Sequence, residues 1–409
     1  MAAADSSSLN FLYKRLYAKG LDEDALMSGN NLLKWVKRDK KFASPQGKAI
    51  AAPYVNPQGI GATYATADAN TQPRQGVQFL VTQAKMIGRV DISRDVLQNA
   101  ENGGDEAQFI NAFTSEVDGA TEMFGQEINQ RLYGSTLGER AKVHPTTAIS
   151  TTQLTLANYQ DAQFFEVGMF VSAADPAGAQ RNAGSTVRIV AVDPATGVLT
   201  ANQNWSTITG ITNGDSLIRA SFWTASLAGL AGWVPTSVTP GESFFGVDRS
   251  PYRTRLAGVY FDASTFSIRQ GFLKSFGFAR QQIGGKFDQK APIFVHPDNF
   301  IQIVQSVEAV RILDLKLETS YNVGIEAVEV LGNTIVQDRH CPLNQAYMVP
   351  KGAFTFASAG DPKIEDAAGS GRFVFEPATG LLKGTIVLLG NGYSEAPNTL
   401  MRLQLPTPV

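Results

Sequence analysis

The sequence predicts an α+β fold in which one long helix and several β-rich segments share the chain. Between Gly104 and Gly134, large apolar residues recur at intervals of three and four, which is typical of an amphipathic helix that ends at a glycine. Residues 143–222 instead hold short apolar runs separated by turn residues, as strands do. In residues 291–356 a short apolar run stops at Pro297 and a helical run follows, so strand and helix alternate there.

Length and composition allow a substantial core with weakly charged surfaces. The 409 residues suffice for two or three packed units. Charged residues make up only 18% of the chain, below the usual quarter, and small and neutral polar residues replace them. Polar but weakly charged surfaces lose little free energy on desolvation, so this composition favours extended protein contacts. A Gly/Ala-rich β protein of another kind would share the same composition.

The charge balance argues against sequence-specific nucleic-acid binding. The chain carries 35 basic and 37 acidic residues, a formal net charge of −2, and no basic block stands out. A dedicated nucleic-acid reader concentrates Lys and Arg on one face to neutralise phosphates. The single cysteine, Cys341, excludes an internal disulfide and indicates synthesis in a reducing cytoplasm. With no export signal or membrane-length apolar run, we expect a soluble, unexported protein with no membrane partner.

The first 90 residues predict two peripheral segments. In residues 1–43, Leu9, Leu12, Leu16 and Tyr17 share one helical face, and a second short apolar segment spans residues 32–36. These short helices form either an arm or an ordinary first helical layer. Residues 44–90 are rich in Gly, Ala, Gln, Thr and Pro, and the alternation in residues 76–82 favours a strand over a linker. We therefore predict a long two-stranded loop that projects from the body.

The remainder of the chain predicts a host body with an insertion. The long helix belongs to residues 91–142, and we interpret the β-rich residues 143–222 as a small inserted barrel. A second helix over residues 265–276 precedes the strand at residues 291–295, and Asp298 or Asn299 is placed to cap the helix after it. Alternating strands over residues 372–375, 381–389 and 400–405 close the sequence.

No catalytic, cofactor-binding or metal-binding residue is predicted. The three histidines, His144, His296 and His340, form no close pair and no zinc motif. His340 beside Cys341 would point to the opposite face of a strand, which argues against a nucleophile–base pair. The glycine run at residues 59–64 lacks the third glycine of a dinucleotide fingerprint and leads into polar loop sequence instead of a helix. The sequence therefore predicts a protein that is not an enzyme and needs no cofactor.

The order of these parts resembles the major capsid proteins of tailed bacteriophages, which share the Hong Kong 97 fold. The resemblance rests on three runs: Ala291–Val304, Val328–Asp338 and Cys341–Pro350. It also rests on the succession of loop, helix and strands before them, and it covers roughly residues 44–142 and 223–405. It implies six parts: an N-terminal arm (1–43), an extended loop (44–90), a peripheral domain with a spine helix (91–142), an inserted β-rich domain (143–222), an axial domain (223–345), and a return to the peripheral domain (346–409).

The resemblance implies a coat protein that assembles into hexamers and pentamers of an icosahedral phage head around double-stranded DNA. The implied partners are copies of the chain itself, portal and scaffolding proteins, and, as a further candidate, a decoration protein. The implied location is the virion, after synthesis in the host cytoplasm. DNA would be enclosed without sequence-specific binding. In some relatives a lysine of the extended loop forms a covalent link to a neighbouring subunit, and Lys48 lies in the matching region.

Two alternatives stay open at the level of sequence. An encapsulin shares the fold but encloses an enzyme, and the inserted barrel and long arm argue against this more compact class. A β-rich soluble hydrolase would suit the abundance of strands, yet no nucleophile, acid–base pair or metal cluster is recognisable.

Overall fold

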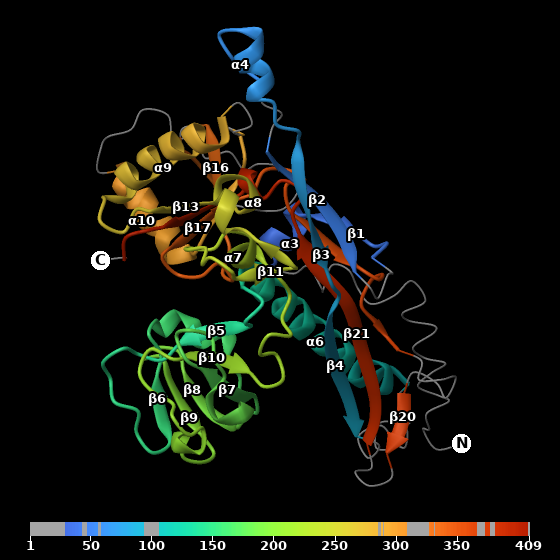
Figure 1. Cartoon of the computed structure of the whole chain (residues 1–409). Helices are drawn as coiled ribbons and strands as arrows, with labels where there is room; N and C mark the ends of the chain where they lie inside the picture. Colours follow the sequence, from blue (N-terminus) through green and yellow to red (C-terminus); the bar gives the residue numbers. More distant parts are fainter. Residues whose placement is uncertain are drawn as a thin grey trace.

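The computed structural model describes residues 29–42, 47–55, 59–93, 106–284, 288, 290–308, 327–330, 332–365, 373–376 and 381–407. Within them, one long helix and one long sheet lie side by side, a hairpin projects from one end of the body, and a separate β unit lies at the other end (Figure 1). The predicted helical residues Leu9, Leu12, Leu16 and Tyr17 lie outside the described residues, as does Gly104.

The first sheet is built around one 13-residue strand, β21. It contains β1 (Lys37–Asp39), β4 (Ala84–Ser93), β18 (Thr355–Ser358), β19 (Lys363–Ile364), β20 (Phe373–Glu376) and β21 (Leu381–Tyr393). β4 runs antiparallel to β21 over ten residue pairs, from Ala84 opposite Gly390 to Ser93 opposite Leu381. Along β21 alternate side chains are buried, which is the period of two expected for a sheet with one covered face.

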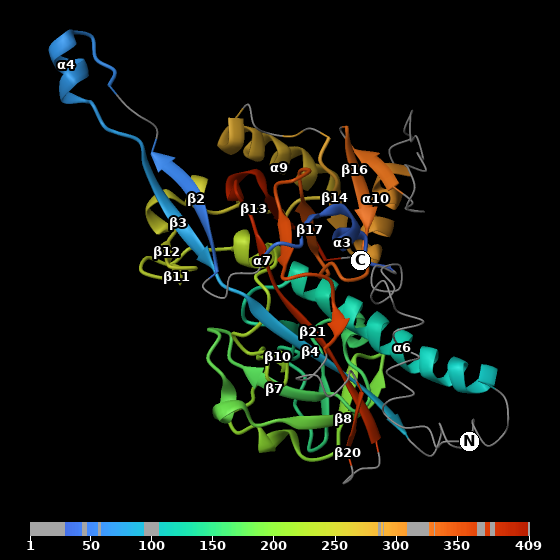
Figure 2. The same cartoon turned by 90° about the vertical axis from the view of Figure 1, so that its right-hand side faces the viewer.

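Helix α6 (Glu106–Tyr133) covers that face, as Figure 2 shows. It occupies the predicted place of the long helix. Its apolar stripe packs on the sheet: the rings of Phe113 and Phe373 lie 5.5 Å apart, edge to face. Gly88 of β4 faces Phe124, and a Cβ there would lie 3.1 Å from the Phe124 ring, so the absence of a side chain lets helix and strand approach closely.

The second sheet forms a unit with a hydrophobic core of its own. Its strands, in spatial order, are β5 (Glu139–Lys142), β10 (Ser216–Arg219), β7 (Phe170–Ala174), β8 (Val187–Asp193), β9 (Val198–Ala201) and β6 (Gln153–Thr155). An isolated bridge between Val143 and Leu156 joins the two outer strands. Fully buried Trp205 lies in the core between them. The sheet includes β5, so it begins four residues before the start predicted at residue 143.

Three 3₁₀ helices lie between the strands of this unit: η1 (Tyr159–Phe164), η2 (Arg181–Gly184) and η3 (Trp205–Thr207). Of these, η1 faces the rest of the chain. Gln160 donates a 2.7 Å hydrogen bond to Asp298, and Gln163 donates one of 3.0 Å to the carbonyl of Arg339. These side-chain hydrogen bonds therefore join the second sheet to the body, in addition to the two chain segments that lead into and out of it.

The third sheet draws strands from widely separated parts of the sequence. Its spatial order is β13 (Val259–Asp262), β22 (Met401–Gln404), β17 (Gln345–Met348), β14 (Ile293–Val295), β16 (Asn333–Gln337) and β15 (Ala327–Val330). Helices α9 (Ile268–Ile283) and α10 (Pro297–Glu308) lie beside this sheet. The sequence predicted that all of residues 346–409 return to the domain of the long helix. This prediction is wrong for β22, which lies between β13 and β17. The side chains of Met401 and Leu403 in β22 are buried in the hydrophobic core of the third sheet.

Shorter elements complete the described chain: α3 (Asn31–Trp35), α7 (Leu230–Trp233), η4 (Ser250–Tyr252), α8 (Arg253–Leu256), η6 (Pro397–Thr399), and the small strand pair β11 (Ser243–Phe244) and β12 (Val247–Asp248). The described part of the predicted arm packs into the body, because Leu32 and Leu33 of α3 are buried and β1 runs parallel to β18. No helix within the described ranges is both long and apolar enough to cross a membrane.

Candidate functional site

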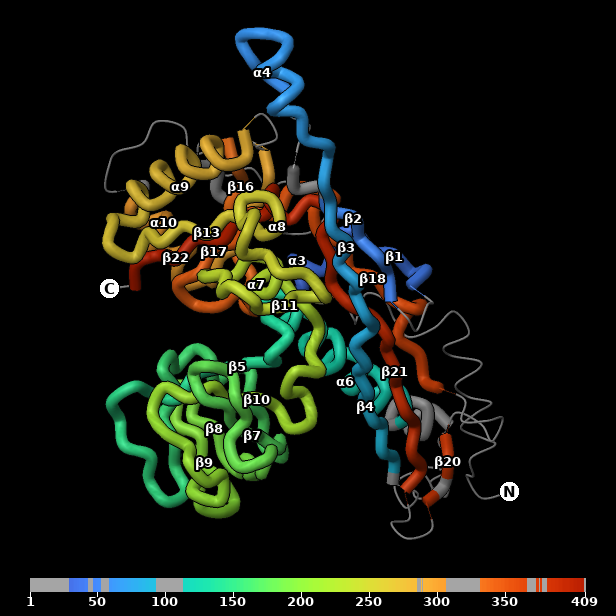
Figure 3. The backbone as a smooth tube through the Cα atoms, viewed as in Figure 1, coloured from blue at the N-terminus to red at the C-terminus, as the bar shows by residue number. Residues whose placement is uncertain are grey.

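The projecting hairpin is anchored at its base by aromatic packing. Strands β2 (Lys48–Val55) and β3 (Gln75–Val81) pair antiparallel, and Figure 3 shows the chain running out along one and back along the other. Phe79 is fully buried, with its ring 5.2 Å from that of Trp233 and 6.3 Å from that of Phe244. The root of the hairpin therefore belongs to the main core, which fixes the direction in which the rest projects.

The tip of the hairpin carries a small folded unit, residues 59–71, which we call the knob. Its six-residue helix α4 (Tyr64–Ala69) has no buried residue. Thr63 and Thr66 form a reciprocal capping box, and Asn70 donates a 2.9 Å hydrogen bond to the carbonyl of Ile60. These bonds compensate for a helix too short to be stable by itself. The sequence predicted polar loop instead of helix after residues 59–64, so α4 and its cap correct that prediction.

The knob presents large apolar side chains to solvent. Tyr64 is 95% exposed and Ile60 is 88% exposed, the two highest values among the exposed large hydrophobic side chains of the described chain. Single exposed apolar residues are ordinary, but two on one preformed, projecting unit indicate a surface that binds another molecule.

Lys48 lies at the root of the hairpin and not at its tip. Its Nζ donates hydrogen bonds to the Tyr393 hydroxyl at 2.6 Å and to Asp39 Oδ2 at 3.0 Å, and lies 4.4 Å from the Tyr393 ring centre. Burial acts to lower the pKa of Lys48, but the bonds to Tyr393 and Asp39 outweigh it and raise the pKa. A protonated amine held by its own chain is a poor nucleophile, so this geometry does not favour Lys48 as a linking residue.

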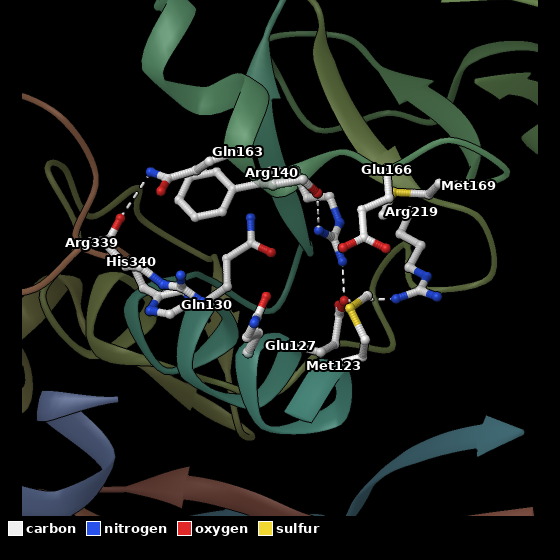
Figure 4. Close-up of a pocket in the computed structure, with 12 residues that line it drawn as sticks. Met123, Glu127, Gln130, Arg140, Gln163, Glu166, Met169, Arg219, Arg339 and His340 are labelled. Carbon is white, nitrogen blue, oxygen red and sulfur yellow. Dashed lines mark hydrogen bonds and ion pairs between the residues drawn. The ribbon is translucent and has the colours of Figure 1, made fainter. Parts of the chain in front are cut away.

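A buried charged junction joins α6 to the second sheet (Figure 4). The Glu127 carboxylate accepts hydrogen bonds from Arg131 of α6, Arg140 of β5 and Arg219 of β10. The Arg131 Nε bond is 2.6 Å long and the Arg219 Nη1 bond is 2.8 Å long. Glu127, Arg131 and Arg140 are all buried, so each strand end is tied to the helix through one shared anion.

The junction is held together by electrostatic attraction. Burial acts to raise the pKa of Glu127, but Arg140, Arg131 and Arg219 together hold it well below its usual range. The carboxylate therefore stays ionised at neutral pH and cannot serve as a general acid or base there. One adjoining pocket, lined by Met123, Phe164 and Arg339 among others, measures about 70 Å³, and a wider one, lined by Phe124, Glu127 and Arg219 among others, measures about 560 Å³.

A second buried carboxylate, Asp338, ties α6 to the N-terminal segment and the third sheet. It accepts hydrogen bonds from the Leu32 backbone N–H, the Tyr133 hydroxyl and the His340 backbone N–H, at 3.0, 3.0 and 2.9 Å. Burial raises the pKa of the Tyr133 hydroxyl well above its ordinary value, and the neighbouring Asp338 charge adds to the shift. The tyrosine therefore remains a proton donor in this bond.

The three histidines lie apart and serve separate structural roles. The half-buried His144 accepts from the Thr147 N–H at 2.9 Å, and His340 Nδ1 lies 2.8 Å from the buried Asn129 amide. His296 Nδ1 accepts from the Asp298 N–H at 3.2 Å, and the His296 carbonyl accepts from the Phe300 N–H at 2.9 Å. His296, and not Asp298 or Asn299, is therefore the residue that caps α10, because Pro297 occupies the first helical position.

Cys341 is buried and inert in this arrangement. Its Sγ donates weak hydrogen bonds to the carbonyls of Gln345 and Phe294, at 3.5 and 3.6 Å. Burial raises the pKa of the thiol well above its ordinary value, which suppresses the reactive thiolate. The described residues hold no group of three or more His, Cys, Asp or Glu side chains that could bind a metal ion.

The sequence matches no protein-family model and no curated protein. Solved structures do match. The capsid of cyanophage A-1(L) aligns with a TM-score of 0.51 at 13% identity, over 94% of this chain and 93% of that one. The capsid of Myoviridae phage XM1 aligns at 0.45 and 8% identity, over 92% and 91%. The SrpI encapsulin of Synechococcus elongatus aligns at 0.42 and 9% identity, over 91% and 86%.

The first of these alignments extends over nearly the whole of both chains. The first of these structures is a phage capsid protein. The chain has the fold of phage capsid proteins.

Proposed function

We propose that this chain is a major capsid protein that self-assembles into hexamers and pentamers of an icosahedral phage head. The observation that carries the proposal is the β2–β3 hairpin. Its root is locked into the core by Phe79, while its tip offers Tyr64 and Ile60 to solvent. A projecting tip with two large exposed apolar side chains is explained by a neighbouring copy that receives it, as expected for the extended loop of the capsid family.

We assign the parts of the fold on that basis. The first sheet with α6 is the peripheral domain, with α6 as the spine helix, and the third sheet with α9 and α10 is the axial domain. Residues 139–219 are the inserted domain, and the bridge between Val143 and Leu156 supports its description as a small closed barrel. The extended loop is the hairpin of residues 48–81, since β4 already belongs to the first sheet.

The physical basis of assembly is multivalency. Each contact between copies buries a modest area, but every copy makes several at once, so their free energies combine in a closed shell. The near-neutral charge suits a container that encloses double-stranded DNA without sequence-specific contacts. Portal and scaffolding proteins are the expected partners during assembly, and a decoration protein is a further candidate.

Expression of the full chain with and without a scaffold, followed by size-exclusion chromatography and negative-stain microscopy, tests the proposal. We expect capsomers or closed particles of uniform size. Persistent monomers at high concentration under both conditions would refute self-assembly. Particles that package an enzyme and never DNA would instead identify the encapsulin class.

A further inference from the structure

The knob combines apolar and acidic groups on one face. Tyr64 and Asp68 stand one helical turn apart on α4, at positions i and i+4, which places them on the same side of the helix. The Ile60 carbonyl accepts a hydrogen bond from Asn70, which holds the segment carrying Ile60 against the end of α4. Within the residues that the structure describes, Asp68 makes no ion pair. The knob therefore displays an unpaired carboxylate next to two exposed apolar side chains.

The second sheet carries a surface of matching character, formed by Val167, Phe170, Arg188 and Val190, which we call the outer patch. Phe170 of β7 and Arg188 of β8 are direct cross-strand partners and so share one face of the sheet. Val187 and Ile189, on either side of Arg188, are fully buried and face the core. The exposed fractions of Val167, Phe170 and Val190 are 68%, 52% and 44%.

Hydrogen bonds hold the outer patch in shape. The Gly168 N–H donates to the Ile189 carbonyl at 2.8 Å, which brings the turn carrying Val167 against β8. The Arg188 N–H donates to the Asn202 side chain at 3.1 Å. The guanidinium of Arg188 lies beside Gly168, with Nη2 3.7 Å from the position a Cβ would take, and it makes no ion pair within residues 106–284.

We propose that the knob of one copy docks on the outer patch of the next copy, with Tyr64 and Ile60 against Phe170, Val167 and Val190, and Asp68 paired with Arg188. The inference rests on the proposed self-assembly and names the surface that receives the hairpin. Both surfaces are apolar with one charged group, and the two charges are opposite. Pairing them removes apolar area from water and gives each charge a partner.

The positions of the two surfaces determine the symmetry of the contact. The knob and the second sheet lie at opposite ends of the molecule in both Figure 1 and Figure 2. One copy therefore cannot satisfy both surfaces by itself, and the contact is head to tail. A head-to-tail contact whose rotation closes generates a ring, as hexamers and pentamers require.

The contact is small. Three side chains on the knob and four on the outer patch bury far less than the roughly 800 Å² per partner of a stable pair, so two isolated copies separate readily. Around a closed ring every copy makes the contact twice, once through its knob and once through its patch, which raises its effective strength. The knob–patch contact accordingly acts only together with the other contacts of the shell.

A paired cysteine variant tests the contact directly. The chain has one native cysteine, Cys341, which is buried and does not compete. In the variant Tyr64→Cys/Phe170→Cys, mild oxidation joins the two new thiols as a disulfide and transfers two electrons to the added oxidant. We expect a ladder that extends past the dimer on non-reducing gels. Tyr64→Cys alone and Phe170→Cys alone give dimers at most. Wild-type particles without a ladder in the paired variant would overturn the inference but not the function.

Charge exchange supplies an independent test. Asp68→Arg and Arg188→Asp each place like charges together, so we expect the fraction of chain in particles to fall at least about tenfold in each. The double variant Asp68→Arg/Arg188→Asp restores assembly, and Lys351→Asp, on an exposed turn, leaves assembly unchanged. Normal assembly of both single variants would refute the pairing. If the wild type forms no particles, the proposed function fails, and the inference fails with it.

Discussion

Glu127 and Arg219 form the bond that joins the long helix to the last strand of the second sheet. Arg219 Nη1 of β10 donates to Glu127 Oε2 of α6 at 2.8 Å, across 92 residues of sequence. Because Arg131 and Arg140 bind the same carboxylate, one buried anion balances three guanidinium groups. This arrangement makes the attachment of the second sheet sensitive to a single side chain.

Glu127→Gln should destabilise the protein strongly. The amide keeps the volume of the side chain but leaves three guanidinium groups, two of them buried, without a counter-charge, which costs about 3–5 kcal/mol. Urea unfolding followed by circular dichroism measures the loss. The control Glu122→Gln changes an exposed residue that accepts from Gln126, and should shift stability by less than about 0.5 kcal/mol. Equal stability of the two variants would contradict the role of the junction.

Tyr133→Phe should weaken the attachment of the N-terminal segment. The substitution removes the hydroxyl that donates to the Asp338 carboxylate, and a hydrogen bond to a charged group contributes about 1.5–3 kcal/mol. The loss should appear in thermal unfolding, together with faster proteolysis near α3, whose Leu32 N–H binds the same carboxylate. Tyr159→Phe, at an exposed position, serves as the control. An unchanged melting temperature for Tyr133→Phe would show that this bond contributes nothing.

Asp161 should make the second sheet less stable as the pH rises. Burial raises the pKa of Asp161 to about 7, although the hydrogen bond from Asn158 opposes the shift. The folded state therefore holds a proton that the unfolded chain releases near pH 4, and stability decreases between about pH 4 and pH 7. Asp161→Asn mimics the protonated form, so it should remove this dependence and stabilise the protein at pH 8 by a few kcal/mol.

Melting temperatures of wild type and Asp161→Asn, measured from pH 4 to pH 8, check this prediction. The two curves should meet near pH 4 and separate above it. Asp91→Asn, on the exposed side of β4, should follow the wild type throughout. Parallel curves for wild type and Asp161→Asn would exclude Asp161 as the titrating group.

The root and the tip of the hairpin should respond differently to substitution. Phe79→Ala opens a cavity beside Trp233 and should reduce stability by about 3–5 kcal/mol. Tyr64→Ser changes an exposed residue, so its stability should stay within about 0.5 kcal/mol of wild type while its yield of particles falls. Leu273→Ser, exposed on α9, is the control for loss of a surface apolar group. Unimpaired assembly of Tyr64→Ser would argue against a role of the knob in self-assembly.

Local patterns in the sequence were sufficient for several elements. The spacing of apolar residues predicted α6, since a helix repeats every 3.6 residues whatever it packs on. The alternation in residues 76–82 predicted β3, and Pro297 marked the change from β14 to α10. The absence of a histidine pair or cysteine motif likewise needed no coordinates. The knob helix was missed because its Thr63–Thr66 cap lacks the usual Glu or Gln at the third position.

Long-range pairing could not be predicted in this way. Nothing near Met401 in the sequence indicates that β22 pairs with β13 instead of β21. Met401 and its partner Val259 are 142 residues apart in the chain. Glu127 likewise binds the arginines at positions 131, 140 and 219. In the sequence, each of these arginines has the pattern of an ordinary charged surface residue. Such contacts depend on which apolar faces meet when the chain folds.

By itself the sequence determined the kinds of segment in this protein: a long helix, a projecting strand pair and a β-rich unit. Helical and strand periods and turn residues are properties of neighbours in the chain, so they can be read locally. Only the tertiary structure decided which strands share a sheet, that Glu127 and Asp338 are buried anions, and that Tyr64 and Arg188 face solvent at opposite ends. These facts arise from burial and from contacts between distant residues, which no local pattern encodes.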